Sequence, residues 1–143
     1  MMKVKIGQVL ALRLPFDTSR ENISETKHPY LIVRMIDNDT LEVAQLDSLQ
    51  GKEWKALWKS NHVIYATEPT ETVIDKHSYV RLDTTIQLEY FDGIIRFRRQ
   101  EAKLSPAKLA LVIQKYNNYH KENRINEEKQ IYVSKEETLD YNS

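Results

Sequence analysis

The chain has 143 residues, of which 41% are hydrophobic and 29% are charged; this size suits one folded domain and excludes a multidomain assembly. No run approaches the roughly 20 apolar residues of a membrane-spanning helix, and the first residues lack the apolar stretch of a secretory signal, so we expect a cytoplasmic protein with no membrane partner. The 21 basic and 21 acidic residues balance, which argues against coating nucleic acid through bulk charge alone. The absence of cysteine excludes disulfides and thiolate chemistry, and we expect neither a cofactor nor a metal site.

The first third of the chain predicts short strands joined by one long loop. Residues 7–14 are mostly apolar and end at Pro15, which cannot donate to a central sheet. Residues 17–28 are polar and predict a surface loop long enough to suggest a function. The apolar run 30–36, a turn at 37–39 and the run 41–48 predict a hairpin. The apolar period slips between Val43 and Leu46, which predicts a bulge near residues 44–45.

The rest of the body predicts one bent strand, a second hairpin and a helix. Residues 79–90 alternate apolar and polar side chains, and their length predicts a break near 84–85. The Asp92-Gly93 pair predicts a tight turn that returns the chain through 94–99. Ser105 is a suitable N-cap, and Pro106 suits the first helical position. The fold class is therefore mainly β with a C-terminal helix, arranged as a small β-barrel in residues 1–121.

Residues 122–143 differ in charge from the body. They hold three basic and six acidic residues, a net charge of −3, while residues 1–121 carry +3. Little of this segment is periodic, so we expect a charged, flexible tail or an arm that docks elsewhere. Such a tail could cover a basic face of the body.

His28 stands where the polar loop meets the buried strand. Histidine exchanges protons near neutral pH, so His28 is the first candidate for acid or base chemistry. The alternative is a surface histidine that only shapes the entrance of the strand.

Residues 52–59 interleave lysines with two tryptophans. Single-stranded nucleic acid is bound by this combination, because bases stack on aromatic rings while ammonium groups meet phosphates. The alternative is a short helix that buries Trp54 and Trp58, which are one helical turn apart, and leaves the lysines in water.

Several short motifs in chain order resemble the PemK/MazF family of toxin endoribonucleases. They are Gly7-Gln8-Val9, Leu14-Pro15-Phe16, Lys27-His28-Pro29 with the apolar strand that follows it, Ser78-Tyr79-Val80-Arg81-Leu82-Asp83, and the helix start Leu104-Ser105-Pro106. The resemblance spans about residues 6–119. Family members commonly carry Lys-Arg-Pro before the hydrophobic strand, so His28 replaces the usual arginine here.

This resemblance implies an SH3-like barrel that forms a homodimer and is neutralised by an antitoxin protein. It implies a groove that holds single-stranded RNA and cleaves it without metal, leaving a 2′,3′-cyclic phosphate and a 5′-hydroxyl. The family arginine falls at His28 and the family hydroxyl at about Ser48, which are the predicted catalytic residues. The predicted RNA-binding residues are Lys27, Asp47, Lys52, Trp54, Lys55 and Arg81. In this scheme His28 moves the proton, Lys27 binds the scissile phosphate and Ser48 bonds its oxygen.

A second hypothesis keeps the fold without the chemistry. The missing arginine and the zero net charge favour a non-catalytic SH3-like module that binds a protein or nucleic-acid partner.

Overall fold

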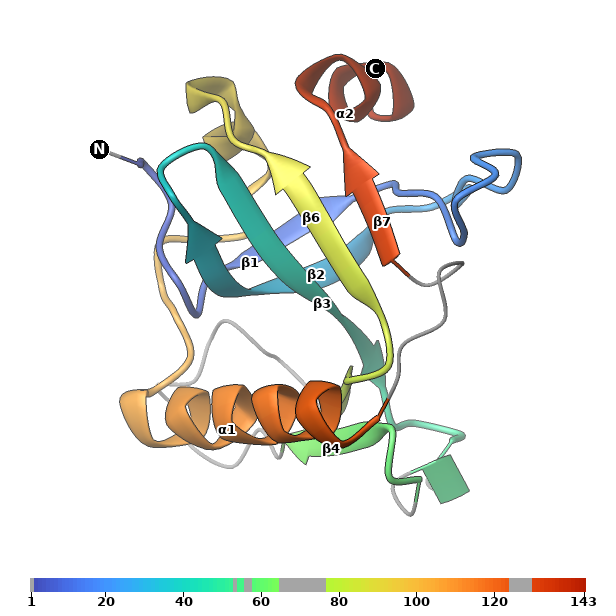
Figure 1. Ribbon diagram of the computed structural model, residues 1–143, viewed down its shortest axis with the longest axis vertical. Helices are drawn as coiled ribbons and strands as arrows, with labels where there is room; N and C mark the ends of the chain where they lie inside the picture. The colour runs from blue at the N-terminus through green and yellow to red at the C-terminus, as the bar shows by residue number, and fades with distance from the viewer. Residues whose placement is uncertain (1, 53, 56–57, 65–76, 124–129) are drawn as a thin grey trace.

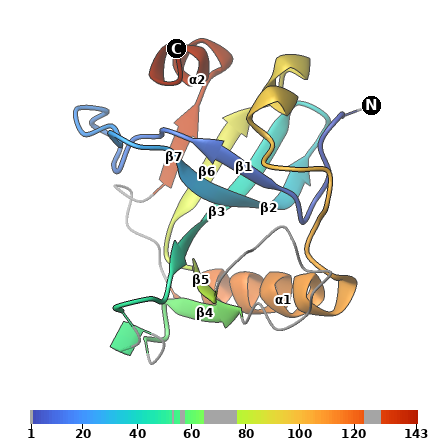
Figure 2. The same ribbon diagram turned by 180° about the vertical axis from the view of Figure 1, so that it is seen from behind.

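The structure is a computed structural model that describes residues 2–52, 54–55, 58–64, 77–123 and 130–143. It is mainly antiparallel β-sheet with helices at two ends of the molecule (Figures 1 and 2). The strands are β1 (Val9–Leu12), β2 (His28–Ile36), β3 (Thr40–Ser48), β4 (Asn61–Ile64), β5 (Ser78–Arg81), β6 (Thr85–Glu89) and β7 (Gln130–Val133). The helices are the 3₁₀ helix η2 (Asp92–Phe97), α1 (Pro106–Glu122) and α2 (Lys135–Tyr141).

Strand β3 connects the two parts of the sheet. Residues 40–45 pair with β2 in an antiparallel hairpin, as predicted, and Asp37 in the turn has the positive φ that short polar residues tolerate. On its other side, residues 40–43 pair with β6 while residues 46–48 pair with β5, and β4 adds to the far edge of β5. The C-terminal end of β3 therefore lies beside β5 and β4, where several predicted site residues gather.

The predicted bulge near residues 44–45 is wrong. Ala44 and Gln45 pair regularly with β2, and the register shift lies on β2 between Ile32 and Arg34. The apolar residues of β3 change from odd to even positions because the first half of the strand buries one face and the second half buries the other. Successive side chains of a strand point to opposite faces, so Leu41 and Val43 enter one core, while Ala44 and Leu46 enter a second core that Val112 and Tyr116 of α1 cover.

The predicted strand over 79–90 is confirmed as two strands, β5 and β6, separated at residues 82–84. The predicted hairpin through 94–99 is wrong, because the chain forms η2 instead and Gly93 lacks the positive φ of a tight turn. A 3₁₀ helix has three residues per turn. Ile94 and Phe97 therefore lie on one side of η2, and both are buried in the first core.

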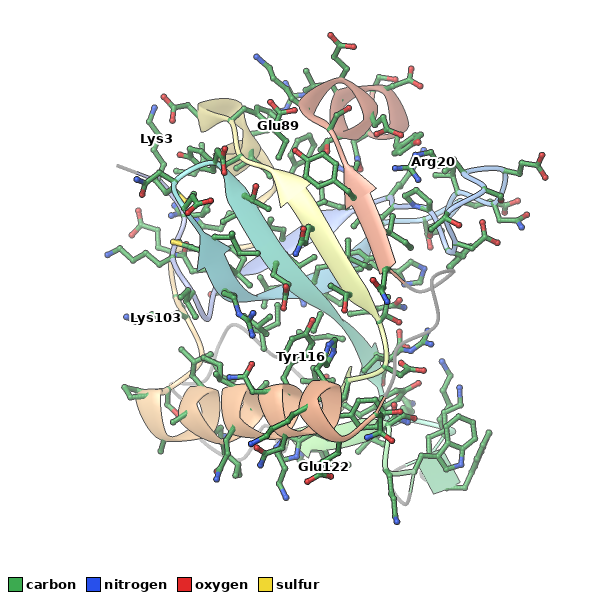
Figure 3. The ribbon with its side chains drawn as sticks, viewed as in Figure 1. Lys3, Arg20, Glu89, Lys103, Tyr116 and Glu122 are labelled. Carbon is green, nitrogen blue, oxygen red and sulfur yellow. The ribbon has the colours of Figure 1, made fainter. Side chains whose placement is uncertain are left out.

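The predicted helix start at Ser105 and Pro106 is confirmed. Helix α1 packs Val112 and Tyr116 against the second core, and Figure 3 shows Tyr116 pointing from the helix toward the sheet. Gly7 permits this close packing. Its φ is +95°, and a Cβ atom there would meet the Leu109 side chain at 2.9 Å.

The expectation of a flexible tail is wrong for residues 130–143. Strand β7 pairs in parallel with β6, and Ile131 and Val133 are buried in the first core. In α2, Ser134 and Glu137 form a reciprocal capping box. The Glu137 carboxylate also accepts a hydrogen bond from Arg20 of the long loop, whose guanidinium donates to the Tyr132 carbonyl as well. The C-terminal segment is thus an integral layer of the fold.

The idea that the acidic segment covers the basic face also changes. Helix α2 lies at the opposite end of the molecule from β4 in both views (Figures 1 and 2). Helix α2 therefore stands away from the site at the end of β3.

Candidate functional site

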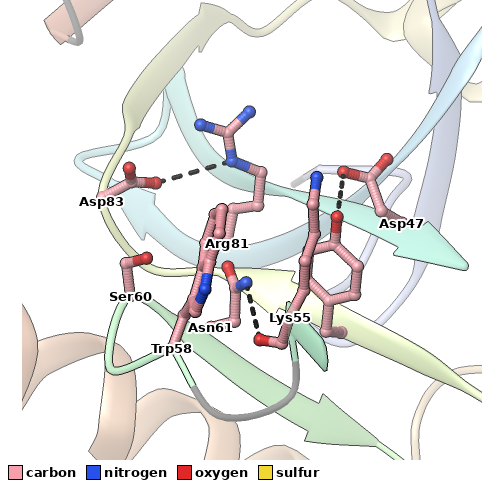
Figure 4. A pocket seen from close by; sticks show the side chains of 8 residues that line it. Asp47, Lys55, Trp58, Ser60, Asn61, Arg81 and Asp83 are labelled. Carbon is pink, nitrogen blue, oxygen red and sulfur yellow. Dashed lines mark hydrogen bonds and ion pairs between the residues drawn. The ribbon is translucent and has the colours of Figure 1, made fainter. Parts of the chain in front are cut away.

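A cavity of about 150 Å³ opens where β3, β4 and β5 meet (Figure 4). Its walls come from strand ends, which the sheet register places, and from the segments next to β4 and β5. The lining residues are Asp47, Lys55, Trp58, Ser60, Asn61, Tyr79, Arg81 and Asp83. Two cations, two carboxylates and an exposed indole therefore share one small polar site.

Asp47 and Tyr79 form one wall of the cavity. They are paired across β3 and β5, so their side chains lie on the same face of the sheet. The Tyr79 hydroxyl donates to the Asp47 carboxylate at 3.2 Å, and the Gln45 amide donates to the other carboxylate oxygen at 3.2 Å. Burial, together with the negative charge of Asp47, raises the pKa of Tyr79 to about 12. Tyr79 thus stays a neutral donor that orients the carboxylate.

Tyr30 lies within reach of the same charges. Its ring is buried in the first core. Burial chiefly raises the pKa of the Tyr30 hydroxyl, the charge of Asp47 adds to the rise, and the charge of Arg81 opposes it. The electrostatic influence of both cavity residues therefore extends to β2.

Arg81 and Lys55 supply the positive charge of the cavity. The Nε atom of Arg81 lies 3.5 Å from an Asp83 carboxylate oxygen (Figure 4). Lys55 is held by its backbone, because its carbonyl accepts a hydrogen bond from the Asn61 side chain at 3.1 Å. The site can thus present a planar N–H fork and an ammonium group to an anion.

Trp54 and Trp58 form an exposed aromatic pair next to the cavity. Their exposed fractions are 57% and 48%, so the alternative in which a short helix buries both is wrong. The ring centroids are 5.1 Å apart at an interplanar angle of 68°. The Lys55 ammonium lies 5.4 Å from one ring centroid and 5.5 Å from the other, in cation–π contact with both. We call these three residues the tryptophan platform.

Of the predicted RNA-binding residues, the structure brings four together. Asp47, Lys55 and Arg81 line the cavity, and Trp54 stands beside it on the tryptophan platform. Lys52 is exposed and begins the turn that leads to the platform, with its carbonyl accepting from the backbone N–H of Lys55 at 2.9 Å.

The remaining three predicted residues do not line the cavity. His28 is the first residue of β2, half-buried and paired with Leu12 of β1. The Ser48 hydroxyl accepts a hydrogen bond from the backbone N–H of Gln50 at 3.2 Å. The Lys27 ammonium lies 5.6 Å from the centroid of the Phe97 ring of η2.

Tyr79, Asp83, Ser60 and Asn61 were not among the predicted site residues. The alternation of residues 79–90 already puts Tyr79 on one face with Arg81 and Asp83, because every second side chain of an extended segment shares a face. Ser60 and Asn61 carry no such signal, since their position depends on the pairing of β4 with β5.

The buried tyrosines predict a loss of stability in alkali. Burial raises the pKa of Tyr30, Tyr79 and Tyr116 above the ordinary value of 10.0. Above about pH 10 the unfolded chain therefore loses protons that the folded chain retains, so stability is full below that pH and falls as pH rises toward the folded-state values. We expect the urea midpoint to fall from about pH 9 to about pH 11, and Tyr79→Phe to remove part of the decrease. A midpoint that stays constant over this range would contradict the assignment.

The comparisons identify no relative. No family model matches the sequence, and none of the curated proteins searched matches it. Within the described residues no helix has the length and apolar character needed to cross a membrane. In the same residues, histidine and carboxylate side chains form no group of three or more that could hold a metal ion.

Proposed function

We propose that this chain is a cytoplasmic endoribonuclease with an SH3-like barrel, and that it cleaves single-stranded RNA without a metal ion. One observation carries the proposal: a guanidinium, an ammonium and two carboxylates face one small cavity beside an exposed tryptophan pair. The motif resemblance to PemK/MazF toxins supports the same activity, and the antiparallel sheet is compatible with the fold of that family.

The tryptophan platform supports the choice of a single strand. Bases in a duplex are stacked on each other, while unpaired bases stack on exposed aromatic rings, at roughly 1–3 kcal/mol per base. Lys55 contacts both rings and also faces the cavity. A base on Trp58 would therefore place its phosphate next to a positive charge.

Arg81 supports cleavage as well as binding. The resemblance leads us to expect an arginine before Pro29, and histidine stands there instead. In this proposal Arg81 supplies that guanidinium from β5. A guanidinium binds two phosphate oxygens at once and stays charged at every accessible pH. Its terminal nitrogens would stabilise the negative charge that develops on the phosphorane.

Asp47 completes the proposed chemistry as the general base. Its carboxylate takes the proton from the 2′-hydroxyl, the 2′-oxygen forms a bond to phosphorus, and the bond from phosphorus to the 5′-oxygen breaks. The departing 5′-oxygen takes a proton from solvent water, and the protonated Asp47 returns its proton to the solvent, so that no net proton is gained or lost. The products are a 2′,3′-cyclic phosphate and a 5′-hydroxyl, as the resemblance implies. This scheme moves the catalytic roles from His28 and Ser48 to Asp47 and Arg81.

Two partners belong to the proposal through the resemblance. A second copy of the chain would form the homodimer. An antitoxin with an acidic or amphipathic segment would block RNA by occupying the tryptophan platform, whose exposed rings suit the anchors of a partner peptide.

A second candidate function is RNA binding without cleavage. The Arg81–Asp83 ion pair favours it, because a guanidinium already held by a carboxylate has less charge to offer a phosphate. Asp47 also faces the cavity and would repel a phosphate placed close to it.

Incubation of purified protein with a long single-stranded RNA in EDTA tests the proposal. We expect the wild type to release fragments with cyclic phosphate ends, and Asp47→Asn to cleave at least about 100-fold more slowly. His28→Ala and Ser48→Ala are the matched variants at the strand ends. If they abolish cleavage while Asp47→Asn does not, catalysis lies at His28 and Ser48 rather than in the cavity. RNA that binds but stays intact would favour the second candidate.

A further inference from the structure

A second and larger cavity, of about 520 Å³, lies between β4 and the C-terminal half of α1. We call it the helix groove. Lys115, Asn118, Tyr119 and Glu122 face it from α1, at the three- and four-residue spacing that puts side chains on one face of a helix. Lys59 faces it from the turn before β4, and Asn61 faces it from the first position of β4. The predicted and proposed catalytic residues lie outside its walls.

The walls of the helix groove carry groups that suit a nucleotide chain. Lys59 and Lys115 bring two ammonium groups, the three asparagine side chains of the lining bring amide donors and acceptors, and Tyr119 brings an aromatic ring. The pKa of His62, which also lines the groove, is lowered by burial and then by the charge of Lys115. Lys115 is itself exposed, so its ammonium faces both the groove and the solvent.

The turn from Trp58 to Asn61 connects the two cavities. Asn61 lines both of them, and Lys59 follows Trp58 directly in the chain. The turn is fixed at three points: the Asn61 N–H donates to the Trp58 carbonyl at 3.0 Å, its side chain donates to the Lys55 carbonyl at 3.1 Å, and the Leu82 N–H donates to the Ser60 carbonyl at 2.8 Å. An RNA strand that runs from the first cavity over this turn therefore lies on a surface that these hydrogen bonds hold in place.

We propose that the helix groove is a second subsite for single-stranded RNA, which holds the nucleotides next to those in the cavity of Asp47 and Arg81. This inference rests on the proposed function. The first cavity places two carboxylates beside two cations, whereas the helix groove places Glu122 alone against Lys59 and Lys115. The groove therefore contributes net positive charge where the catalytic cavity contributes none. RNA suits it better than an acidic peptide, because the groove continues from an aromatic platform and offers amides to base edges.

The binding of two RNA lengths tests the subsite. We would measure the affinity of a fluorescent dinucleotide, which fills only the first cavity, and of an oligonucleotide of about 8 nucleotides, within the site sizes of single-strand-binding folds. Lys115→Glu is expected to weaken the longer RNA roughly tenfold and to lower the slope of log affinity against log salt by about 0.7, while the dinucleotide binds as before. Glu122→Gln should strengthen the longer RNA.

Lys103→Glu is the control, because it makes the same charge change near the start of α1, while Glu122 marks the other end of that helix (Figure 3). If Lys115→Glu weakens the binding of both RNAs equally, or of neither, the proposed subsite is contradicted. RNA binding by the protein is not contradicted by that outcome. If Lys115→Glu instead abolishes binding of a polyglutamate peptide and leaves the longer RNA unaffected, the groove is a protein-docking site and the inference is overturned. A wild type that binds neither RNA would overturn the proposed function and the subsite together.

Discussion

Replacing Arg81 with alanine is expected to slow RNA cleavage by roughly 100- to 1,000-fold, the usual cost of removing one donor that stabilises charge in a transition state. The loss should appear mainly in kcat, because the guanidinium meets a phosphate whose negative charge grows as the reaction proceeds. Lys55, which also lines the cavity, would retain part of the ground-state binding. Single-turnover cleavage of an RNA at saturating protein measures this directly.

Two further variants separate chemistry from structure. Arg81→Lys keeps the charge but loses the planar fork, so it should restore RNA binding more than cleavage. Asp83→Asn keeps Arg81 and removes its ion-pair partner at 3.5 Å. If cleavage rises in Asp83→Asn, the ion pair restrains the guanidinium in the wild type. Cleavage by Arg81→Ala at the wild-type rate would contradict the assignment of Arg81.

Deleting residues 130–143 is expected to prevent folding. The deletion removes β7 from the sheet and takes Ile131 and Val133 out of the first core. Burial of each such side chain stabilises a protein by about 1.5–3 kcal/mol, and a domain of this size has a net stability of only about 5–15 kcal/mol. The lost β7 ladder and α2 cap add to this deficit. Circular dichroism of the shortened chain measures the outcome.

A single substitution in β7 tests the contribution of this strand to the core in a chain that still folds. Ile131→Ala should lower the free energy of unfolding by about 2–5 kcal/mol, because it leaves a cavity in the first core. Tyr132 is the matched control, since it is 47% exposed and its neighbours in the strand are buried. Tyr132→Ala should change stability by about 0.5 kcal/mol or less. Equal urea midpoints for the two variants, or a shortened chain as stable as the full one, would mean that β7 does not support the core.

Charge and local pattern misled the interpretation of this segment. Its net charge of −3 and its short apolar run predict a solvated tail. The run Ile131-Tyr132-Val133 alternates buried and exposed side chains only because β6 offers an edge, and residues 130 and 85 are far apart in the sequence. Two parallel strands are joined by a long connection rather than by a tight turn, so no turn motif in the sequence predicts their pairing.

The candidate site also depends partly on local sequence pattern and partly on tertiary contacts. The alternation of residues 79–90 is local, and it already put Arg81 on one face with Tyr79 and Asp83. That Asp47 rather than Ser48 faces this group depends on the register of β3 against β5, and a shift of one residue would have exchanged the two. The exposure of both tryptophans also depends on tertiary contacts. Their four-residue spacing is equally compatible with a helical turn that is buried and with one that is exposed.

The sequence by itself determined the elements whose signals are local. These are the strands of the first hairpin, the break between β5 and β6, and the start of α1, because side-chain periodicity, turn residues and capping preferences act over a few neighbouring residues. Only the tertiary structure decided that β3 is buried on both faces, that residues 92–97 form a 3₁₀ helix, that β7 completes the sheet, and that Asp47 and Arg81 share a cavity with Trp58. Each of these depends on contacts between residues distant in the chain, whose free energy comes from burial in a common core rather than from any local preference.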